Sequence, residues 1–249
     1  MNSLFEASEQ SNLERAKPLA ARMRPTNLTE FVGQQHFLGA GKLLSRLLQA
    51  DRLGSVIFYG PPGCGKTTLA QLLATETKST FCQLSAVTSG VKDLRAILET
   101  AQNELRAGGS RTLLFIDEIH RFNKAQQDAL LPDVENGIIT LVGATTSNPF
   151  FAVNNALTSR STIFQFEPLA VEDLEPLLDR ALNDQFRGLG RYDVTLTEEA
   201  RTFIAEVSDG DARRALSILE IGVLSSGTFP LEFNLALAEE SIQRKAMQY

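Results

Sequence analysis

The chain has 249 residues, of which 43% are hydrophobic and 22% charged, a composition typical of a soluble globular protein. The length allows one large domain or two small ones with ample core. A net charge of −6 does not indicate a nucleic-acid-binding protein, although a local patch or a ring-shaped assembly can gather positive charge on one face. Only two cysteines, Cys64 and Cys82, make a disulfide scaffold unlikely, and two histidines, His36 and His120, without a Cys-x-x-Cys pair argue against structural zinc.

No membrane partner is expected. No apolar run approaches the roughly 20 residues that span a bilayer. Residues 1–6 lack both the basic and the apolar region of a signal peptide. We therefore expect a cytoplasmic protein.

The N-terminal residues are polar, and residues 1–17 are expected to form a flexible segment. Four basic residues lie close together along the chain: Arg15, Lys17, Arg22 and Arg24. Its two interpretations are a solvated basic arm and a nucleic-acid patch, and we slightly favour the arm.

Strand and helix patterns alternate along residues 18–168. Apolar periodicity and the positions of glycine and proline predict helices at 37–53, 68–77, 93–106 and 124–135, and strands at 55–59, 80–84, 112–116, 140–144 and 161–166. This alternation predicts an α/β fold, a three-layer sandwich around a five-stranded parallel sheet. The fully apolar strand at 112–116 fits a sheet that is covered on both faces.

The pattern changes at Pro168, after which only helical periodicity is seen. Helices are predicted at 174–186, 198–207, 212–224 and 231–247. Residues 169–249 are therefore expected to form a small all-α lid domain.

One short segment matches the pattern Gly-x-x-x-x-Gly-Lys-Thr of a phosphate-binding loop, between a predicted strand and a predicted helix. Its residues are Gly60, Pro61, Pro62, Gly63, Cys64, Gly65, Lys66 and Thr67, with Thr68 following in the helix. The glycines allow backbone conformations that bring N–H groups close to a phosphate. Lys66 can reach the outer phosphates, and the Thr67 hydroxyl can hold Mg²⁺. A tolerated small residue is the favoured interpretation of Cys64, rather than a redox switch.

Two acids follow the apolar strand at 112–116. Asp117 and Glu118 would lie at the carboxyl edge of the sheet, where ligands bind in open α/β folds. Asp117 can hold Mg²⁺ together with Thr67. Glu118 can orient or deprotonate an attacking water.

Three further positions have no role that spacing alone assigns. Polar residues after the strand at 140–144, among them Thr146 and Asn148, can contact a phosphate or water, or equally cap a turn. Arg160 and Arg213 carry the permanent planar charge that suits phosphoryl transfer, but surface arginines are common.

Taken together, these residues resemble the AAA+ ATPases and, more narrowly, the bacterial family of replication-associated recombination protein A, which is related to the Werner-helicase-interacting ATPase and to clamp-loader subunits. The resemblance covers the chain from about residue 18 to the end. It rests on Gly143-Ala144-Thr145-Thr146 with Asn148-Pro149, on Gly210-Asp211-Ala212-Arg213-Arg214, and on residues 18–25, 31–36, 85–92 and 117–127.

The resemblance implies roles for individual residues. Lys66 and Thr67 would be Walker A residues, and Asp117 and Glu118 Walker B residues. Thr146 would be sensor 1, with Asn148 as the alternative. Arg160 would be an arginine finger that reaches a neighbouring subunit, and Arg213 would be sensor 2. Val32, Gly33 and Gln34 would line the adenine pocket.

The resemblance also implies a function. We expect a Mg²⁺-dependent ATPase that acts on DNA with single-stranded regions or fork junctions, near the nucleoid, with single-strand-binding protein and other replication factors as further partners. The family forms tetramers through a C-terminal region that is expected to lie beyond residue 249, so these residues alone are expected to associate weakly or not at all. The alternatives are an ATP-dependent switch or scaffold, a clamp loader and a branch-migration motor resembling RuvB.

Overall fold

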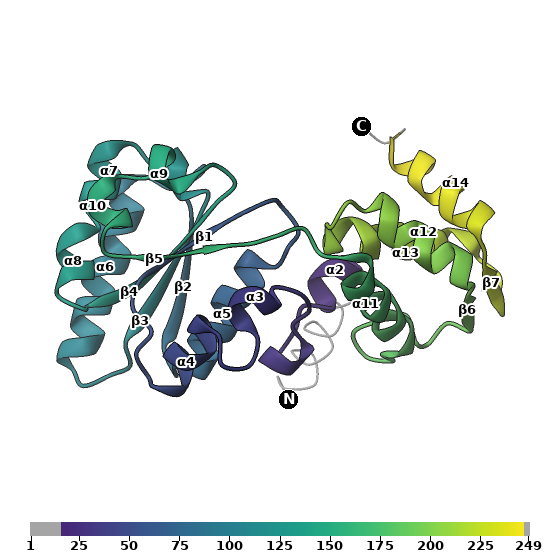
Figure 1. Cartoon of the computed structure of the whole chain (residues 1–249), viewed down its shortest axis with the longest axis horizontal. Coiled ribbons are helices and arrows are strands. Elements are labelled where there is room, and N and C mark those ends of the chain that lie inside the picture. Colours follow the sequence, from purple (N-terminus) through teal and green to yellow (C-terminus); the bar gives the residue numbers. More distant parts are fainter. Residues whose placement is uncertain (1–15, 247–249) are drawn as a thin grey trace, which may run out of the picture. The chain divides into compact units, whose positions relative to one another are not determined.

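The computed structural model describes residues 16–246, with side chains up to residue 242 (Figure 1). It divides into two compact units. An α/β unit spans Thr26–Glu167, and the other described residues, 16–25 and 168–246, form a helical unit. Each unit has its own core.

A five-stranded parallel sheet forms the centre of the α/β unit, as predicted. Its strands are β1 (Val56–Tyr59), β2 (Thr80–Ser85), β3 (Thr112–Asp117), β4 (Ile139–Thr145) and β5 (Thr162–Gln165). The strand order is β2-β3-β4-β1-β5. Strand β4 therefore lies between β1 and β3, which brings the carboxyl ends of these three strands to one edge.

Helices cover both faces of the sheet (Figure 1). One face packs against α3 (Gln35–Leu38), α4 (Leu43–Gln49) and α5 (Lys66–Glu76). The other packs against α6 (Val91–Arg106), α8 (Leu131–Glu135) and α10 (Asn155–Thr158), and α7 (Lys124–Asp128) packs on α10. Successive strand residues alternate between the two cores, with Val56 and Phe58 in the first and Ile57 in the second.

Two predicted helices are each divided in the structure. The helix predicted at 37–53 is α3 and α4, separated by a turn in which Gly41 has φ 72°. The helix predicted at 124–135 is α7 and α8. Pro132 lies in the first turn of α8, where its missing N–H is tolerated. In the interior of one continuous helix the same proline would break the helix.

The helical unit contains α11 (Val171–Asn183), α12 (Glu198–Val207), α13 (Ala212–Ser226) and α14 (Leu235–Ala246). It is not all-α as expected, because β6 (Val194–Leu196) and β7 (Leu231–Phe233) pair in parallel. Leu196 and Phe233 are buried at the ends of these strands. Three-residue strands are too short to give a period-two signal, and the predicted helix at 231–247 begins only after β7.

The chain before the α/β unit belongs to the helical unit, whereas we expected residues 18–25 to open the nucleotide-binding core. Helix α2 (Leu19–Arg22) packs on α13, and Leu19 is fully buried. The side chain of Glu220 accepts the Leu19 N–H at 2.9 Å. Helix α2 is therefore held by the core of the helical unit.

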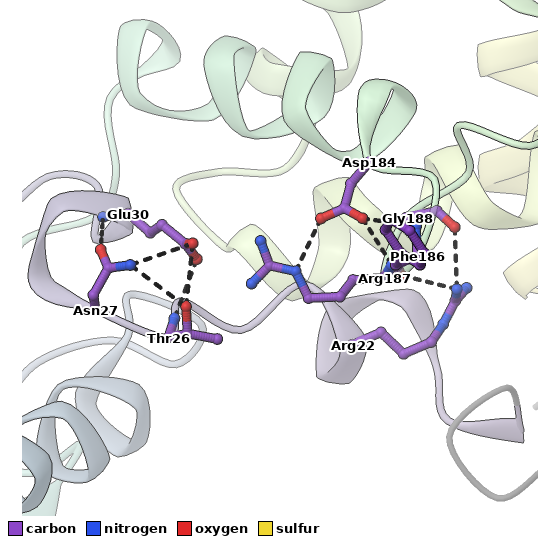
Figure 2. Close-up of polar contacts among 8 residues, drawn as sticks. All are labelled: Arg22, Thr26, Asn27, Glu30, Asp184, Phe186, Arg187 and Gly188. Atoms are coloured by element: carbon purple, nitrogen blue, oxygen red, sulfur yellow. Dashed lines mark hydrogen bonds and ion pairs between the residues drawn. The ribbon is translucent and has the colours of Figure 1, made fainter. Parts of the chain in front are cut away.

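Arg22 is part of that packing rather than of a solvated basic arm, and its side chain is 9% exposed. Its Nη2 is 3.1 Å from Glu220 Oε1. Its Nη1 donates to the carbonyl oxygens of Arg187 at 2.8 Å and Gly188 at 3.2 Å, and Figure 2 draws these contacts as dashed lines. Arg24 is exposed, and Arg15 lies outside the described residues.

The loop that Arg22 contacts is itself ordered by Asp184 (Figure 2). Asp184 Oδ1 accepts the N–H groups of Phe186 at 2.9 Å and Arg187 at 2.8 Å, and Oδ2 accepts Arg187 Nε at 2.9 Å. Burial opposes ionisation, but these hydrogen bonds and the Arg187 charge hold the pKa of Asp184 below its usual value. Among the residues described, none forms a helix long and apolar enough to cross a membrane.

Candidate functional site

The predicted phosphate-binding loop connects β1 to α5 at the carboxyl edge of the sheet. Gly60 and Gly65 have φ of 155° and 99°, and neither position admits a side chain. A Cβ on Gly60 would lie 2.3 Å from the carbonyl oxygen of Phe166, and one on Gly65 would lie 2.8 Å from Phe31 Cζ. The main chain thus takes a conformation that requires glycine, as phosphate-cradling loops do.

Lys66 and Thr67 open α5, and both side chains are largely buried. Lys66 Nζ donates to the carbonyl oxygens of Gly60 at 2.8 Å and Pro61 at 2.6 Å. The ammonium group is therefore held inside the loop. The helix that begins here adds the positive end of its dipole, which favours an anion.

Cys64 lies within the same loop, where its Sγ donates to the Pro61 carbonyl oxygen at 2.9 Å. Burial raises the pKa of the Cys64 thiol, and the nearby Lys66 charge opposes this effect only in part. The thiol is 1% exposed and stays protonated near neutral pH. This agrees with the interpretation of Cys64 as a small residue tolerated in the loop.

Asp117 and Glu118 follow at the end of β3, on the same edge of the sheet. Glu118 adopts the left-handed conformation, with φ 54° and ψ 45°. Such a backbone is uncommon for a residue other than glycine, and strained residues of this kind gather at functional sites. Thr146, just after β4, donates its hydroxyl to Glu118 Oε2 at 3.3 Å.

The two sensor 1 candidates are placed differently. Thr146 contacts Glu118, whereas the Asn148 side-chain oxygen accepts the Phe150 N–H at 3.0 Å. Asn148 is the N-cap of α9 (Pro149–Ala152). The structure thus associates Thr146 with the acidic pair and Asn148 with the following turn.

His120 is a site residue that the sequence reasoning missed, because histidine was considered there only as a zinc ligand. Its Nδ1 lies 2.9 Å from Thr145 Oγ1 and 3.3 Å from Glu118 Oε2. Its side chain is 14% exposed. The sequence feature that could have identified His120 is its position two residues after Glu118, in a turn that brings its side chain back toward the Glu118 carboxylate.

The segment predicted to line the adenine pocket lies beside the loop, because Phe31 packs under Gly65. Gln34 is 5% exposed, and its amide is used at both ends by the main chain of Glu167. Its Nε2 donates to the Glu167 carbonyl oxygen at 2.8 Å, and its Oε1 accepts the Glu167 N–H at 3.0 Å. The Gln34 side chain is therefore fully engaged by the main chain of Glu167.

Arg160 follows α10 at the surface, where its Nη2 pairs with Glu135 Oε1 at 2.8 Å. Its Nη1 also donates to the Ala156 carbonyl oxygen at 2.8 Å. Glu135, the last residue of α8, was not singled out from the sequence. Arg213 belongs to the helical unit, at the start of α13, where its side chain is exposed and its N–H donates to Asp211 Oδ1 at 2.8 Å.

The oxygen donors at this edge suit Mg²⁺. Thr67 offers a hydroxyl and Asp117 a carboxylate, and Mg²⁺ in nucleotide sites is held by one or two such groups together with phosphates and water. In the described part of the chain, no three His, Cys, Asp or Glu side chains cluster as an all-protein metal cage. The donor set therefore fits a metal that arrives with a phosphate ligand.

Comparison with known families agrees with this geometry. The model of the ATPase family associated with various cellular activities (AAA) matches residues 56–169, and that of the AAA C-terminal domain matches residues 190–249. Replication-associated recombination protein A of Escherichia coli K12 is 52% identical over 205 residues, which cover 82% of this chain and 46% of that protein. The chain is an AAA+ protein and belongs to the replication-associated recombination protein A family.

Two further comparisons give the extent of the match. The Bacillus subtilis family member is 43% identical over 236 residues, covering 94% of this chain and 55% of that protein. The chain thus spans about half the length of the curated relatives it matches. The Holliday junction branch migration motor RuvB of Thermotoga maritima superposes with a TM-score of 0.69 at 28% identity, covering 89% of this chain and 72% of that structure. Membership of the AAA family implies nucleotide binding.

Proposed function

We propose that the chain hydrolyses ATP and that it acts on DNA in replication-associated recombination. One observation carries the hydrolytic part: the phosphate-binding loop, the acidic pair and Thr146 lie on adjacent strands at one edge of the sheet. The Gly60 N–H donates to the Thr145 carbonyl oxygen at 3.1 Å, which ties the loop directly to the strand that bears Thr146.

Each residue has a distinct proposed task. The loop N–H groups from Gly63 to Thr67, continued by Thr68 at the start of α5, bind and orient the phosphates. Lys66 exchanges its two carbonyl partners for phosphate oxygens and offsets their charge. Glu118 orients the attacking water and accepts its proton, while Thr146 fixes the Glu118 carboxylate. Thr67 and Asp117 hold Mg²⁺, which when bound supplies positive charge to the phosphates.

Two arginines complete the proposed machinery from outside this edge. Arg160 is exposed next to Glu135 and serves as the finger that stabilises charge on a phosphate held by a neighbouring subunit. Arg213 is exposed on the helical unit and serves as sensor 2. The proposal therefore includes a homo-oligomer, a tetramer in the full-length protein.

The DNA part of the proposal is supported by the relatives' name, replication-associated recombination protein A. We propose DNA with single-stranded regions or fork junctions as the partner, single-strand-binding protein and other replication factors as further partners, and the nucleoid in the cytoplasm as the location. A chain with a net charge of −6 would bind DNA through a local surface or an assembled ring.

The test is steady-state ATP hydrolysis by the protein in its natural length, with and without gapped DNA. Wild-type turnover that DNA stimulates supports the proposal. Glu118→Gln is expected to bind ATP and lose turnover, and Lys66→Ala to lose binding. Arg160→Ala is expected to keep ATP affinity and lose about 10³-fold in turnover, the usual effect of removing an arginine that acts in trans. Normal turnover by Arg160→Ala would refute the finger assignment.

Branch migration of DNA junctions is the second candidate, because the fold is similar to that of the RuvB motor. The higher sequence identity to replication-associated recombination protein A favours the first candidate. Strand exchange on a synthetic four-way junction decides between them. ATP-dependent migration of the junction by the protein alone would reverse the order.

A further inference from the structure

His120 lies in a tight turn that follows Glu118 and packs on β4. The turn, η2 (Ile119–Arg121), begins with the fully buried Ile119. A Cβ at Gly143 would lie 3.0 Å from Ile119 Cδ1, so the turn rests directly on the strand. Gly143 and Thr145 lie on the same face of β4, two residues apart, and His120 meets Thr145 there.

The hydrogen bonds around Thr145 indicate which nitrogen of His120 carries a proton. Thr145 Oγ1 accepts the Ser147 N–H at 3.0 Å and can donate its single proton to the Ser147 carbonyl oxygen at 3.1 Å. His120 Nδ1 is close to both that hydroxyl and the Glu118 carboxylate, which only accepts. A lone pair on Nδ1 would face the carboxylate, whereas an Nδ1–H donates to the Thr145 hydroxyl and attracts the Glu118 carboxylate, whose Oε2 lies 3.3 Å from Nδ1.

We propose that His120 is a positioning residue for hydrolysis, which attracts the Glu118 carboxylate through the close approach of its Nδ1–H to Oε2. This inference rests on the proposed function, because it assigns a support to the residue that orients the water. Thr146 donates to the same oxygen, Oε2. Within residues 16–242 both contacts fall on Oε2, which directs Oε1 to the substrate water.

The support acts on a side chain that would otherwise move. The Glu118 side chain is 30% exposed and has several rotatable bonds, so one contact from Thr146 at 3.3 Å restrains it weakly. His120 is more buried and is fixed in turn by the fully buried Thr145. Each added contact of this kind reduces the misplacement of Glu118 relative to the water, to which turnover is sensitive.

A pair of substitutions separates this role from simple packing. His120→Asn places an amide N–H near the position of Nδ1, and His120→Leu has similar bulk without a donor. We expect His120→Leu to lower kcat by about 10-fold, the lower limit for losing a polar contact with a charged group, with the Kd for ATP within about twofold. His120→Asn is expected to recover kcat to within about threefold of wild type.

Thr145→Val provides a second route if the leucine variant folds poorly. It removes the hydroxyl that orients the imidazole, so kcat falls in the same direction. The double variant with His120→Leu is expected to be no slower than His120→Leu alone, because both changes break one network. Wild-type kcat in His120→Leu, or equal loss in the leucine and asparagine variants, overturns the inference.

The proposed function and this inference fail in distinguishable ways. A wild-type protein without ATPase activity, or an active Glu118→Gln variant, refutes the proposed function. A wild type that hydrolyses ATP, loses turnover in Glu118→Gln and keeps it in His120→Leu refutes the inference alone.

Nuclear magnetic resonance gives a readout that does not depend on activity. The chain has two histidines, so His36→Gln assigns both sets of imidazole signals. At about pH 8, where an ordinary imidazole is neutral, long-range ¹⁵N–¹H spectra report the tautomer. We expect His120 to be protonated at Nδ1, and Glu118→Gln to shift its signals while those of His36 stay in place. A neutral His120 protonated at Nε2 would overturn the inference.

Discussion

Thr146 and Asn148 follow the same strand, and the structure predicts that replacing each has a different consequence. Thr146→Val removes the hydroxyl that donates to Glu118 Oε2 at 3.3 Å. Hydrogen bonds to charged groups contribute about 1.5–3 kcal/mol, and this one is long and exposed, which places it near the lower limit. A loss of about 1.5 kcal/mol from the transition state corresponds to a roughly 10-fold lower kcat.

Asn148→Ala removes the oxygen that caps α9 through the Phe150 N–H. Loss of an N-cap costs about 1 kcal/mol. For a unit the size of Thr26–Glu167, that corresponds to a melting temperature lower by about 3 °C. Because its side chain serves the turn, kcat is expected to stay within about twofold of wild type.

The assay is a crossed comparison of kcat and melting temperature in both variants, with Thr146→Ser as the control that keeps the hydroxyl. We expect Thr146→Val to lose turnover and retain stability, and Asn148→Ala to do the reverse. Thr146→Ser should resemble wild type in both. If Asn148→Ala loses turnover at unchanged stability while Thr146→Val does not, the assignment of Thr146 as sensor 1 is refuted.

Three further predictions test contacts around this site and in the helical unit. Arg22→Ala breaks a largely buried ion pair, so we expect urea titration to show a free energy of unfolding lower by about 2 kcal/mol and ATP affinity to stay unchanged. An unaltered urea midpoint would contradict the packing of α2 on the helical unit. Glu135→Gln removes the charge that pairs with Arg160 at the surface, so we expect the melting temperature to change by less than about 2 °C and turnover at low protein concentration to rise. A fall in turnover would mean that Glu135 orients the proposed finger. Burial raises the pKa of both thiols, but Cys82 is more exposed than Cys64, so N-ethylmaleimide at neutral pH should label Cys82 first. Mass spectrometry of digests measures the labelling, and equal labelling of both cysteines would contradict the burial of Cys64 in the loop.

The sheet could be predicted from the sequence to within a residue or two per strand, because its strands are short apolar runs between clear turns. The order of the strands could not, since it depends on which crossover helix packs on which face. Residues 18–25 were assigned to the wrong unit for a related reason. Their partners Arg187, Gly188 and Glu220 lie between 165 and 201 positions away along the sequence, and no local pattern reports such a contact.

The candidate site likewise contains residues that could be predicted from the sequence and one that could not. Lys66, Thr67, Asp117 and Glu118 are recognisable because their roles require fixed spacing within one loop or one strand end. His120 acquires its role from Thr145, on a strand that reaches it only in the folded sheet. The predicted roles of the phosphate-binding and acidic residues themselves stay predictions until the kinetic tests are made.

Strand β4 links the phosphate-binding loop to the acidic residues, a connection that neither of these two motifs makes alone. The Thr145 carbonyl oxygen accepts the Gly60 N–H at 3.1 Å, and its hydroxyl contacts His120, which in turn reaches Glu118. Thr145 thus contacts the phosphate-binding loop through its main chain. Through its side chain it contacts His120, which lies next to Glu118. Since the main-chain contact survives any substitution other than one that displaces the strand, a change of the Thr145 side chain should alter turnover and leave nucleotide affinity intact. Binding and hydrolysis are therefore separable at this single position, which no spacing of residues along the chain would have indicated.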